Sequence, residues 1–299
     1  MQAGDTTLPR QAASTTMLLT AVAMLAFAAN SLLCRLALQQ ARIDPASFGA
    51  IRLASGALVL LLVMRMRARK QASSKTGGDW PAALMLFLYV AGFSFAYLLL
   101  PAGSGALILF GMVQLTMLAA GLAKGERFTP AGWFGLALAV GGLVLLMLPG
   151  VAAPSLPGAA LMAVAGVAWG IYSLRGRGVP DPLAATAGNF LRATPLGMVL
   201  WLAWAARGHA DAGGVALALA SGAITSGLGY VVWYAALPRL AALQAASVQL
   251  SVPLVAALGG VLLLGEAFTA RLALASVAIL GGIGLVLGAR AARKPSPAN

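Results

Sequence analysis

A segment that occurs twice constrains this chain more than any other feature of its sequence. Residues 125–145 read GERFTPAGWFGLALAVGGLVL, and residues 265–285 read GEAFTARLALASVAILGGIGL. The two segments align without a gap, 140 positions apart, with their Gly-Glu, Phe-Thr and Gly-Gly pairs in register. Internal similarity at a fixed spacing predicts that the chain is built from two related structural units.

Composition places both units in a membrane. Of the 299 residues, 61% are hydrophobic and only 9% are charged, with a mean hydropathy of +0.91. Ten apolar runs of about 18–23 residues are each long enough to cross a hydrocarbon layer as a helix. The runs occupy residues 17–38, 46–66, 81–100, 104–123, 130–148, 157–174, 183–205, 214–236, 241–263 and 270–289. The sequence predicts an all-α integral membrane protein with ten transmembrane helices.

These runs divide the chain into two five-helix repeats. The expected parts are a disordered N-terminal tail (1–16), the first repeat (17–148), a linker (149–156), the second repeat (157–289) and a basic C-terminal tail (290–299). A cleaved signal peptide ending near residue 28 is another interpretation of the first run. We expect a retained helix instead, because the apolar run continues to Leu38 and AFAANS (26–31) matches AWGIYS (168–173) in the second half.

The basic residues predict the orientation. With both termini in the cytoplasm, fourteen lysines and arginines fall on the inner side and four on the outer side, as the positive-inside rule requires. The net charge of +13 therefore indicates loop bias rather than a nucleic-acid partner. Because five is odd, the second repeat is inverted relative to the first, which is typical of secondary transporters. We expect a multi-pass protein of a bacterial inner membrane.

Further motifs recur in the same order in both halves. Arg52 and Arg192 lie early in the second helix of each half, Pro101 and Pro238 follow the third, and Gly-Glu-x-Phe-Thr precedes the fifth. Together these motifs resemble the EamA-type branch of the drug/metabolite transporter superfamily, over residues 17–289. The resemblance implies a ten-helix arrangement around a central cavity, with the last helices of the two halves packed together at one end. A narrower similarity to YddG-type exporters implies export of aromatic and other neutral amino acids.

Polar and aromatic side chains within the apolar runs are the candidate substrate-binding residues. Uncharged hydrogen-bonding groups and rings at helical spacing suit a small amphipathic solute, although any single ring could instead serve core packing. The candidates are Asn30, Tyr89, Phe93, Tyr97, Gln114, Trp169, Tyr172, Tyr230, Tyr234 and Gln249.

A second group of residues has an expected structural or gating role. Glu126 and Glu266 are expected to cap or stabilise the helix that follows each of them. Arg52 and Arg192 either bind a substrate carboxylate or satisfy backbone carbonyls, and their occurrence in both halves favours the structural role. The group consists of Arg52, Arg192, Pro101, Pro238, Glu126 and Glu266.

The fifth and tenth helices are expected to pack through small residues. Ala137 with Gly141, and Gly284 with Gly288, have the small-xxx-small spacing that brings membrane helices close together.

The predicted function is a monomeric secondary transporter that exports small amphipathic metabolites by alternating access, with the lipid bilayer and an amino-acid-like solute as its partners. The sequence also leaves open a nucleobase or a cationic drug as the substrate, and a channel or a membrane-embedded transferase as the function. One cysteine, one histidine and the lack of a GxxxxGK[ST] motif predict no metal, no cofactor and no enzymatic activity.

Overall fold

The computed structural model describes residues 10–68, 77–125, 127–150, 153–240 and 242–291. Within these ranges the regular secondary structure is helical, apart from one isolated antiparallel bridge between Ile43 and Ala210. The predicted all-α fold is confirmed. The first repeat consists of α1 (Arg10–Gln39), α2 (Pro45–Ala68), α3 (Trp80–Tyr97), α4 (Ala102–Ala123) and α5 (Pro130–Met147).

The second repeat has the same order with more interruptions. It consists of α6 (Leu156–Arg175), α7 (Pro182–Trp204), the 3₁₀ turn η1 (Ala205–Arg207), α8 (Ala212–Leu219), η2 (Ala220–Leu228), α9 (Gly229–Ala236), the 3₁₀ turn η3 (Leu237–Arg239), α10 (Ala242–Gln249), α11 (Ser251–Leu264) and α12 (Ala270–Ala291).

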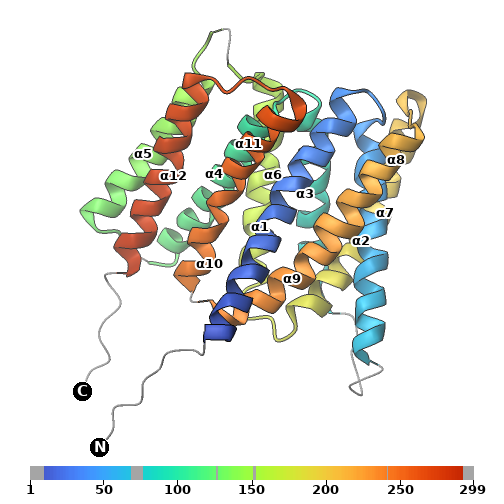
Figure 1. The fold of residues 1–299 in the computed structure, drawn as a ribbon, viewed down its shortest axis with the longest axis horizontal. Coiled ribbons are helices and arrows are strands. Elements are labelled where there is room, and N and C mark those ends of the chain that lie inside the picture. Colours follow the sequence, from blue (N-terminus) through green and yellow to red (C-terminus); the bar gives the residue numbers. More distant parts are fainter. Residues whose placement is uncertain (1–9, 69–76, 126, 151–152, 241, 292–299) are drawn as a thin grey trace, which may run out of the picture.

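Nine segments of the described chain are long and apolar enough to cross a membrane. The tenth predicted span is α7, whose 23 residues include Asn189 and Arg192 and which packs along α2. Helix α7 lies within the same bundle as these nine segments (Figure 1).

The predicted boundaries differ from the structure at both ends. Helix α1 begins at Arg10, inside the segment predicted as a tail, and α12 continues to Ala291. The predicted helix 214–236 is one continuous rod whose centre, η2, is a π-helix. The predicted helix 241–263 is broken at Leu250, between α10 and α11.

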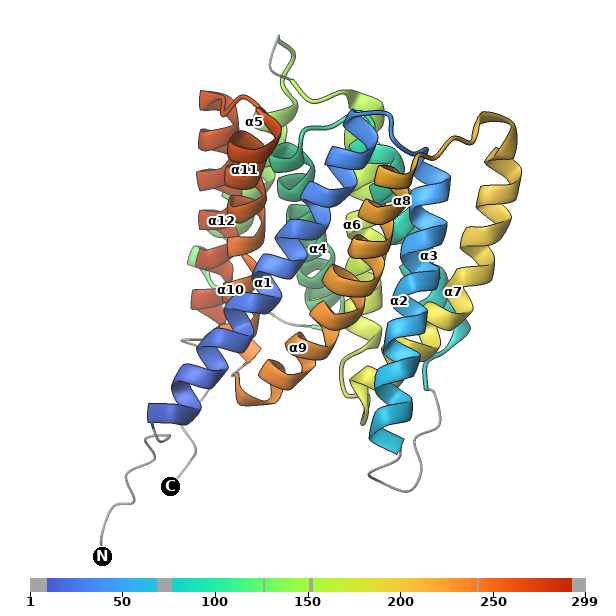
Figure 2. The same ribbon diagram turned by 45° about the vertical axis from the view of Figure 1, so that its right-hand side comes forward.

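Contacts between the repeats follow the two-fold relation that the sequence predicts. Three helices pack against their own counterparts: α5 against α12, α2 against α7 and α4 against α11. Other contacts come in related pairs, because α3–α6 corresponds to α1–α9 and α4–α6 corresponds to α1–α11. The expected pairing of α5 with α12 at one end of the molecule is visible in both ribbon views (Figures 1 and 2).

The glycines that mediate this pairing are not the ones predicted. Gly141, Gly284 and Gly288 have open space where a Cβ would be. A Cβ at Gly282 would instead collide with the backbone of Gly135 on α5. The two helices do pack closely, but the predicted helix faces are wrong, because small residues occur on several faces of both helices.

In each Phe-Thr pair the threonine caps the N-terminus of the helix that follows it, as threonine often does. Thr129 Oγ1 accepts a hydrogen bond from Gly132 N at 3.1 Å, and Thr269 Oγ1 accepts one from Leu272 N at 3.1 Å. The expectation for Glu266 needs a correction, because its carboxylate accepts from Ala102 N at 2.8 and 3.0 Å and so caps α4 of the other repeat. Glu126 lies outside the described residues.

Candidate substrate cavity

A cavity of about 1360 Å³ lies between the two repeats. Its described lining reaches from mid-depth, at Asn30 and Arg52, to the ends of α6 and α12 on one face of the bundle. The described ends of the chain, Arg10 and Ala291, lie on that same face, here called the terminal face (Figure 2). Among the described lining residues, none belongs to the loops of the opposite face. The cavity is therefore open on one side of the membrane only.

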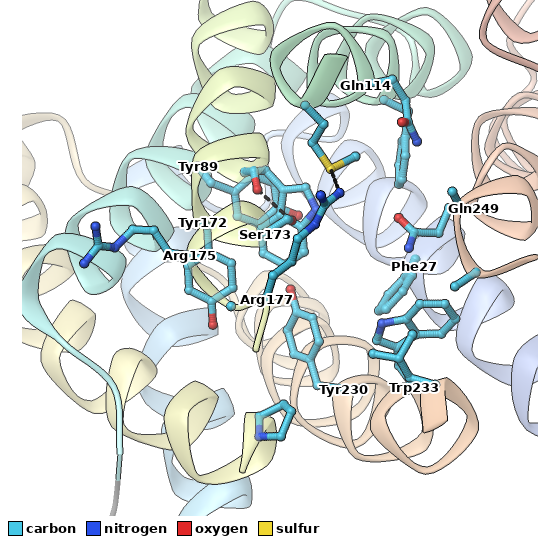
Figure 3. A pocket seen from close by; sticks show the side chains of 18 of the residues that line it. Phe27, Tyr89, Gln114, Tyr172, Ser173, Arg175, Arg177, Tyr230, Trp233 and Gln249 are labelled. Atoms are coloured by element: carbon cyan, nitrogen blue, oxygen red, sulfur yellow. Dashed lines mark hydrogen bonds between the residues drawn. The ribbon is translucent and has the colours of Figure 1, made fainter. Parts of the chain in front are cut away.

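Aromatic rings form the walls. Trp169 on α6 lies at the centre, with ring centroids 4.7 Å from Tyr89, 5.1 Å from Tyr172 and 5.7 Å from Tyr230. In Figure 3, Tyr89 and Tyr172 lie across the cavity from Gln114 and Gln249. Such walls offer apolar surface and polar edges to one solute.

The structure brings nine of the ten candidate binding residues to this cavity. They are Asn30, Tyr89, Phe93, Gln114, Trp169, Tyr172, Tyr230, Tyr234 and Gln249. Tyr97 is the exception: its side chain is buried away from the lining, and its hydroxyl donates to Ala102 O at 3.4 Å. Its ring packs edge-on against Phe93, with centroids 4.7 Å apart. Tyr97 therefore supports the wall from behind.

The π-helix η2 supplies polar contacts that the sequence did not predict. Ser221 Oγ donates to Asn30 Oδ1 at 2.6 Å. Thr225 Oγ1 lies 3.2 Å from the same oxygen and 2.9 Å from Ser221 O, and can donate to either. Gly222 lets this segment approach the backbone of Arg52 closely. π-Helical segments are frequent at functional sites, and this one contributes Thr225 and Ser226 to the cavity lining.

A second polar group, on α7, also lies outside the predicted set. The hydroxyls of Thr186 and Tyr234 are hydrogen-bonded at 2.8 Å, and Asn189 Nδ2 donates to Tyr172 OH at 3.4 Å. All four side chains line the cavity. The sequence could have pointed to Asn189 in one way: it lies three residues before Arg192, so the two side chains share a face of the helix.

The two repeat-related arginines have different surroundings. Arg192 is used structurally, because its Nη1 donates to Gly77 O and Gly188 O, each at 2.9 Å. Arg52 is 1% exposed and lies in the cavity wall. Its Nε donates to Ser226 Oγ at 3.1 Å and its Nη2 to Tyr89 OH at 3.0 Å. The two arginines occupy equivalent positions in the two repeats but have different hydrogen-bond partners.

Hydrogen bonds and an ion pair close the opposite face. Arg35 Nε lies 3.2 Å from Glu266 Oε1, and Arg35 Nη1 donates to Tyr97 O at 2.9 Å. Pro101 is the N-cap of α4 beneath this ion pair, whereas Pro238 lies in η3. The cavity is therefore separated from the opposite face by contacts between the two repeats.

The terminal face is held by more exposed ion pairs. Arg175 lies 3.2 Å from Asp79 and Arg67 lies 3.4 Å from Asp181. A hydrogen bond from Ala82 N, followed by the nearby Arg175, lowers the pKa of Asp79 below its usual value. Both arginine–aspartate pairs are about half exposed, so they contribute little to stability. In the described part of the chain, no group of three His, Cys, Asp or Glu side chains is arranged to hold a metal ion.

A closed bundle of two inverted repeats around a one-sided cavity defines a membrane transporter class. The model of the EamA-like transporter family matches residues 14–148 and again 156–288. The chain belongs to the EamA-like transporter family. An uncharacterized protein of Pseudomonas aeruginosa is 56% identical over 278 residues, covering 93% of this chain and 96% of the relative. A crystal structure with 22% identity, a TM-score of 0.64 and coverage of 93% of this chain and 99% of its own shares the fold. None of these comparisons assigns an amino acid substrate.

Proposed function

We propose that this transporter exports small amphipathic metabolites, with aromatic and other neutral amino acids as the first candidates. The observation that carries the proposal is the aromatic cavity around Trp169, open at one face and sealed at the other by Arg35 and Glu266. A solute with one apolar side chain fits such walls, and the polar groups along them orient its other end.

Export is supported by the direction in which the cavity opens. The positive-inside rule assigns the terminal face to the cytoplasm, and the cavity opens on that face. A solute from the cytoplasm then enters through the mouth beside Arg175 and reaches Asn30 at mid-depth. Alternating access requires that the mouth closes and the Arg35–Glu266 contact opens, which the inverted repeats permit by exchanging their conformations.

The test is a substrate screen with the purified protein in proteoliposomes. Labelled phenylalanine, adenine and tetraphenylphosphonium represent the amino acid, nucleobase and cationic-drug classes, each with and without a proton gradient. We expect saturable uptake of phenylalanine that empty liposomes do not show. Saturable uptake of adenine or tetraphenylphosphonium alone would contradict the amino acid assignment, and flux that stays linear with concentration would indicate a channel.

A further inference from the structure

Arg52 carries a positive charge that no carboxylate of the described residues neutralises. Among the described residues, its Nη1 has no hydrogen-bond acceptor, and no carboxylate lies within ion-pair distance of its guanidinium. The side chain is 1% exposed, so water compensates little of the charge. A buried charge without a counter-ion is costly. Its repeat-related partner Arg192 shows the ordinary solution, with backbone carbonyls as acceptors.

Positive charges outnumber negative ones in the described remainder of the cavity lining. Its described lining contains three further arginines, Arg127, Arg175 and Arg177, against the single carboxylate of Asp79. That carboxylate is already engaged, because it pairs with Arg175 and caps α3. A net positive lining at the mouth attracts anions and repels cations.

A second buried donor, on α4, lines the same cavity across from Tyr89 (Figure 3). Gln114 is 2% exposed, and its Nε2 has no hydrogen-bond acceptor among the described residues. The two buried side-chain groups of the described chain that lack a partner, Gln114 Nε2 and Arg52 Nη1, are therefore both donors. A ligand that satisfies them must supply acceptor atoms. A carboxylate does so with full charge, and it suits the fork of a guanidinium.

Among the described lining residues, an ammonium group finds no unpaired carboxylate. The amide oxygen of Asn30 already accepts from Ser221 Oγ at 2.6 Å. The carboxylate of Asp79 lies at the mouth and holds Arg175. A substrate ammonium would therefore meet neutral hydroxyl and amide groups in a cavity of positive charge.

We propose that the cavity selects monocarboxylates with an apolar side chain, that Arg52 binds the carboxylate, and that the substrate needs no ammonium group. This inference rests on the proposed function, because it names the substrate class of the same cavity. The guanidinium lies 4.9 Å from the Phe93 ring centroid and 5.1 Å from that of Tyr89. A carboxylate reaches Nη1 when one of these rings turns aside, and the substrate's apolar part then packs against the ring.

The test is equilibrium binding to the purified protein, followed by tryptophan fluorescence because Trp169 and Trp233 line the cavity. Four probes share one phenyl group: sodium 3-phenylpropanoate, phenylalanine, 3-phenylpropanamide and phenethylamine. We expect 3-phenylpropanoate to bind saturably, at least as tightly as phenylalanine and at least tenfold more tightly than the amide or the amine. Equal binding of the amide or the amine, or binding of phenylalanine without 3-phenylpropanoate, would overturn the inference.

Substitutions test whether Arg52 and Gln114 bind the carboxylate. We expect Arg52→Gln to weaken 3-phenylpropanoate binding at least tenfold, and Arg52→Lys and Gln114→Leu each to weaken it at least threefold. The control is Arg207→Gln, an exposed arginine that stacks on Trp204 on the opposite face, and its affinity should equal the wild-type value. If Arg52→Gln does not fold, wild-type affinity in both Arg52→Lys and Gln114→Leu would overturn the proposal.

Measuring both binding and transport distinguishes failure of the proposed anion site from failure of the proposed transport function. Carboxylate-selective binding without saturable transport would contradict the proposed function and leave the anion site standing. Saturable transport of phenylalanine together with equal binding of all four probes would retain the function and remove the anion site.

Discussion

Arg35 and Glu266 form an ion pair, with Nε and Oε1 3.2 Å apart, that joins α1 of the first repeat to the turn before α12 of the second. The Glu266 carboxylate also caps α4 through Ala102 N. One acidic side chain thus connects three helices on the face opposite the cavity mouth. Because both partners are at most 16% exposed, this pair is better shielded from solvent than those at the mouth.

The first prediction concerns this closed face. Cys34 is the single cysteine of the chain, it precedes Arg35, and its side chain is buried. We expect Glu266→Gln to raise the rate of Cys34 alkylation by a membrane-permeant maleimide at least tenfold, because the face opens more often. A tenfold change corresponds to about 1.4 kcal/mol in the opening equilibrium. The control Arg207→Gln should react like the wild type, and equal rates in all three proteins would show that the ion pair does not hold the face closed.

The second prediction concerns the central ring. We expect Trp169→Ala to lower transport at least tenfold, because Trp169 contacts Tyr89, Tyr172 and Tyr230 within the cavity. Trp169→Phe should keep most of the activity. Trp201→Ala removes a 42% exposed ring from the outer surface of α7 and serves as the matched control. Unchanged uptake kinetics in Trp169→Ala would remove this ring from the site.

The third prediction concerns the α5–α12 contact. Gly282→Leu places a side chain against the backbone of Gly135, so we expect a loss of stability of about 1–3 kcal/mol or more. Its neighbour Gly281 has open space where a Cβ would be, and Gly281→Leu should melt like the wild type. Thermal unfolding in detergent measures both variants. A destabilised Gly281→Leu beside a stable Gly282→Leu would reverse the assigned helix face.

The fourth prediction concerns orientation. The variants Lys124→Cys and His209→Cys are made in a Cys34→Ala background. Lys124 is the C-cap of α4, which ends on the terminal face, and His209 lies between η1 and α8 on the opposite face; both positions are exposed. We expect an impermeant maleimide added to intact cells to label position 209 and not position 124. The reverse pattern would overturn the proposed cytoplasmic location of the termini. Position 72, between α2 and α3 in the sequence, would probe the same point but lies outside the described residues.

The fold was predictable because its signals are local or periodic. Long apolar runs predict spans, and the repeat at 140 positions predicts the inversion. The pairing of α5 with α12 is what the family resemblance implies. The sequence does not reveal that Glu266 caps a helix 164 positions away, because such a contact depends on how the repeats pack. The faces through which α5 and α12 pack were not predicted correctly for the same reason.

The cavity was predictable where polar or aromatic groups interrupt an apolar helix, as at Asn30 and Trp169. The hydroxyls of Ser221 and Thr225 were not, because a π-helix changes the spacing at which side chains share a face. The difference between Arg52 and Arg192 was also hidden, because equivalent sequence positions meet different neighbours after folding.

Alternating access means that one cavity serves the two membrane faces in turn, and trans-stimulation is the measurement that reports this exchange. Proteoliposomes are loaded with unlabelled phenylalanine, diluted into labelled phenylalanine, and followed without a proton gradient. We expect saturable uptake that is faster than in unloaded vesicles, because a loaded carrier returns with substrate bound. Uptake that is linear in concentration and unaffected by internal phenylalanine would show that the protein is not an alternating-access carrier.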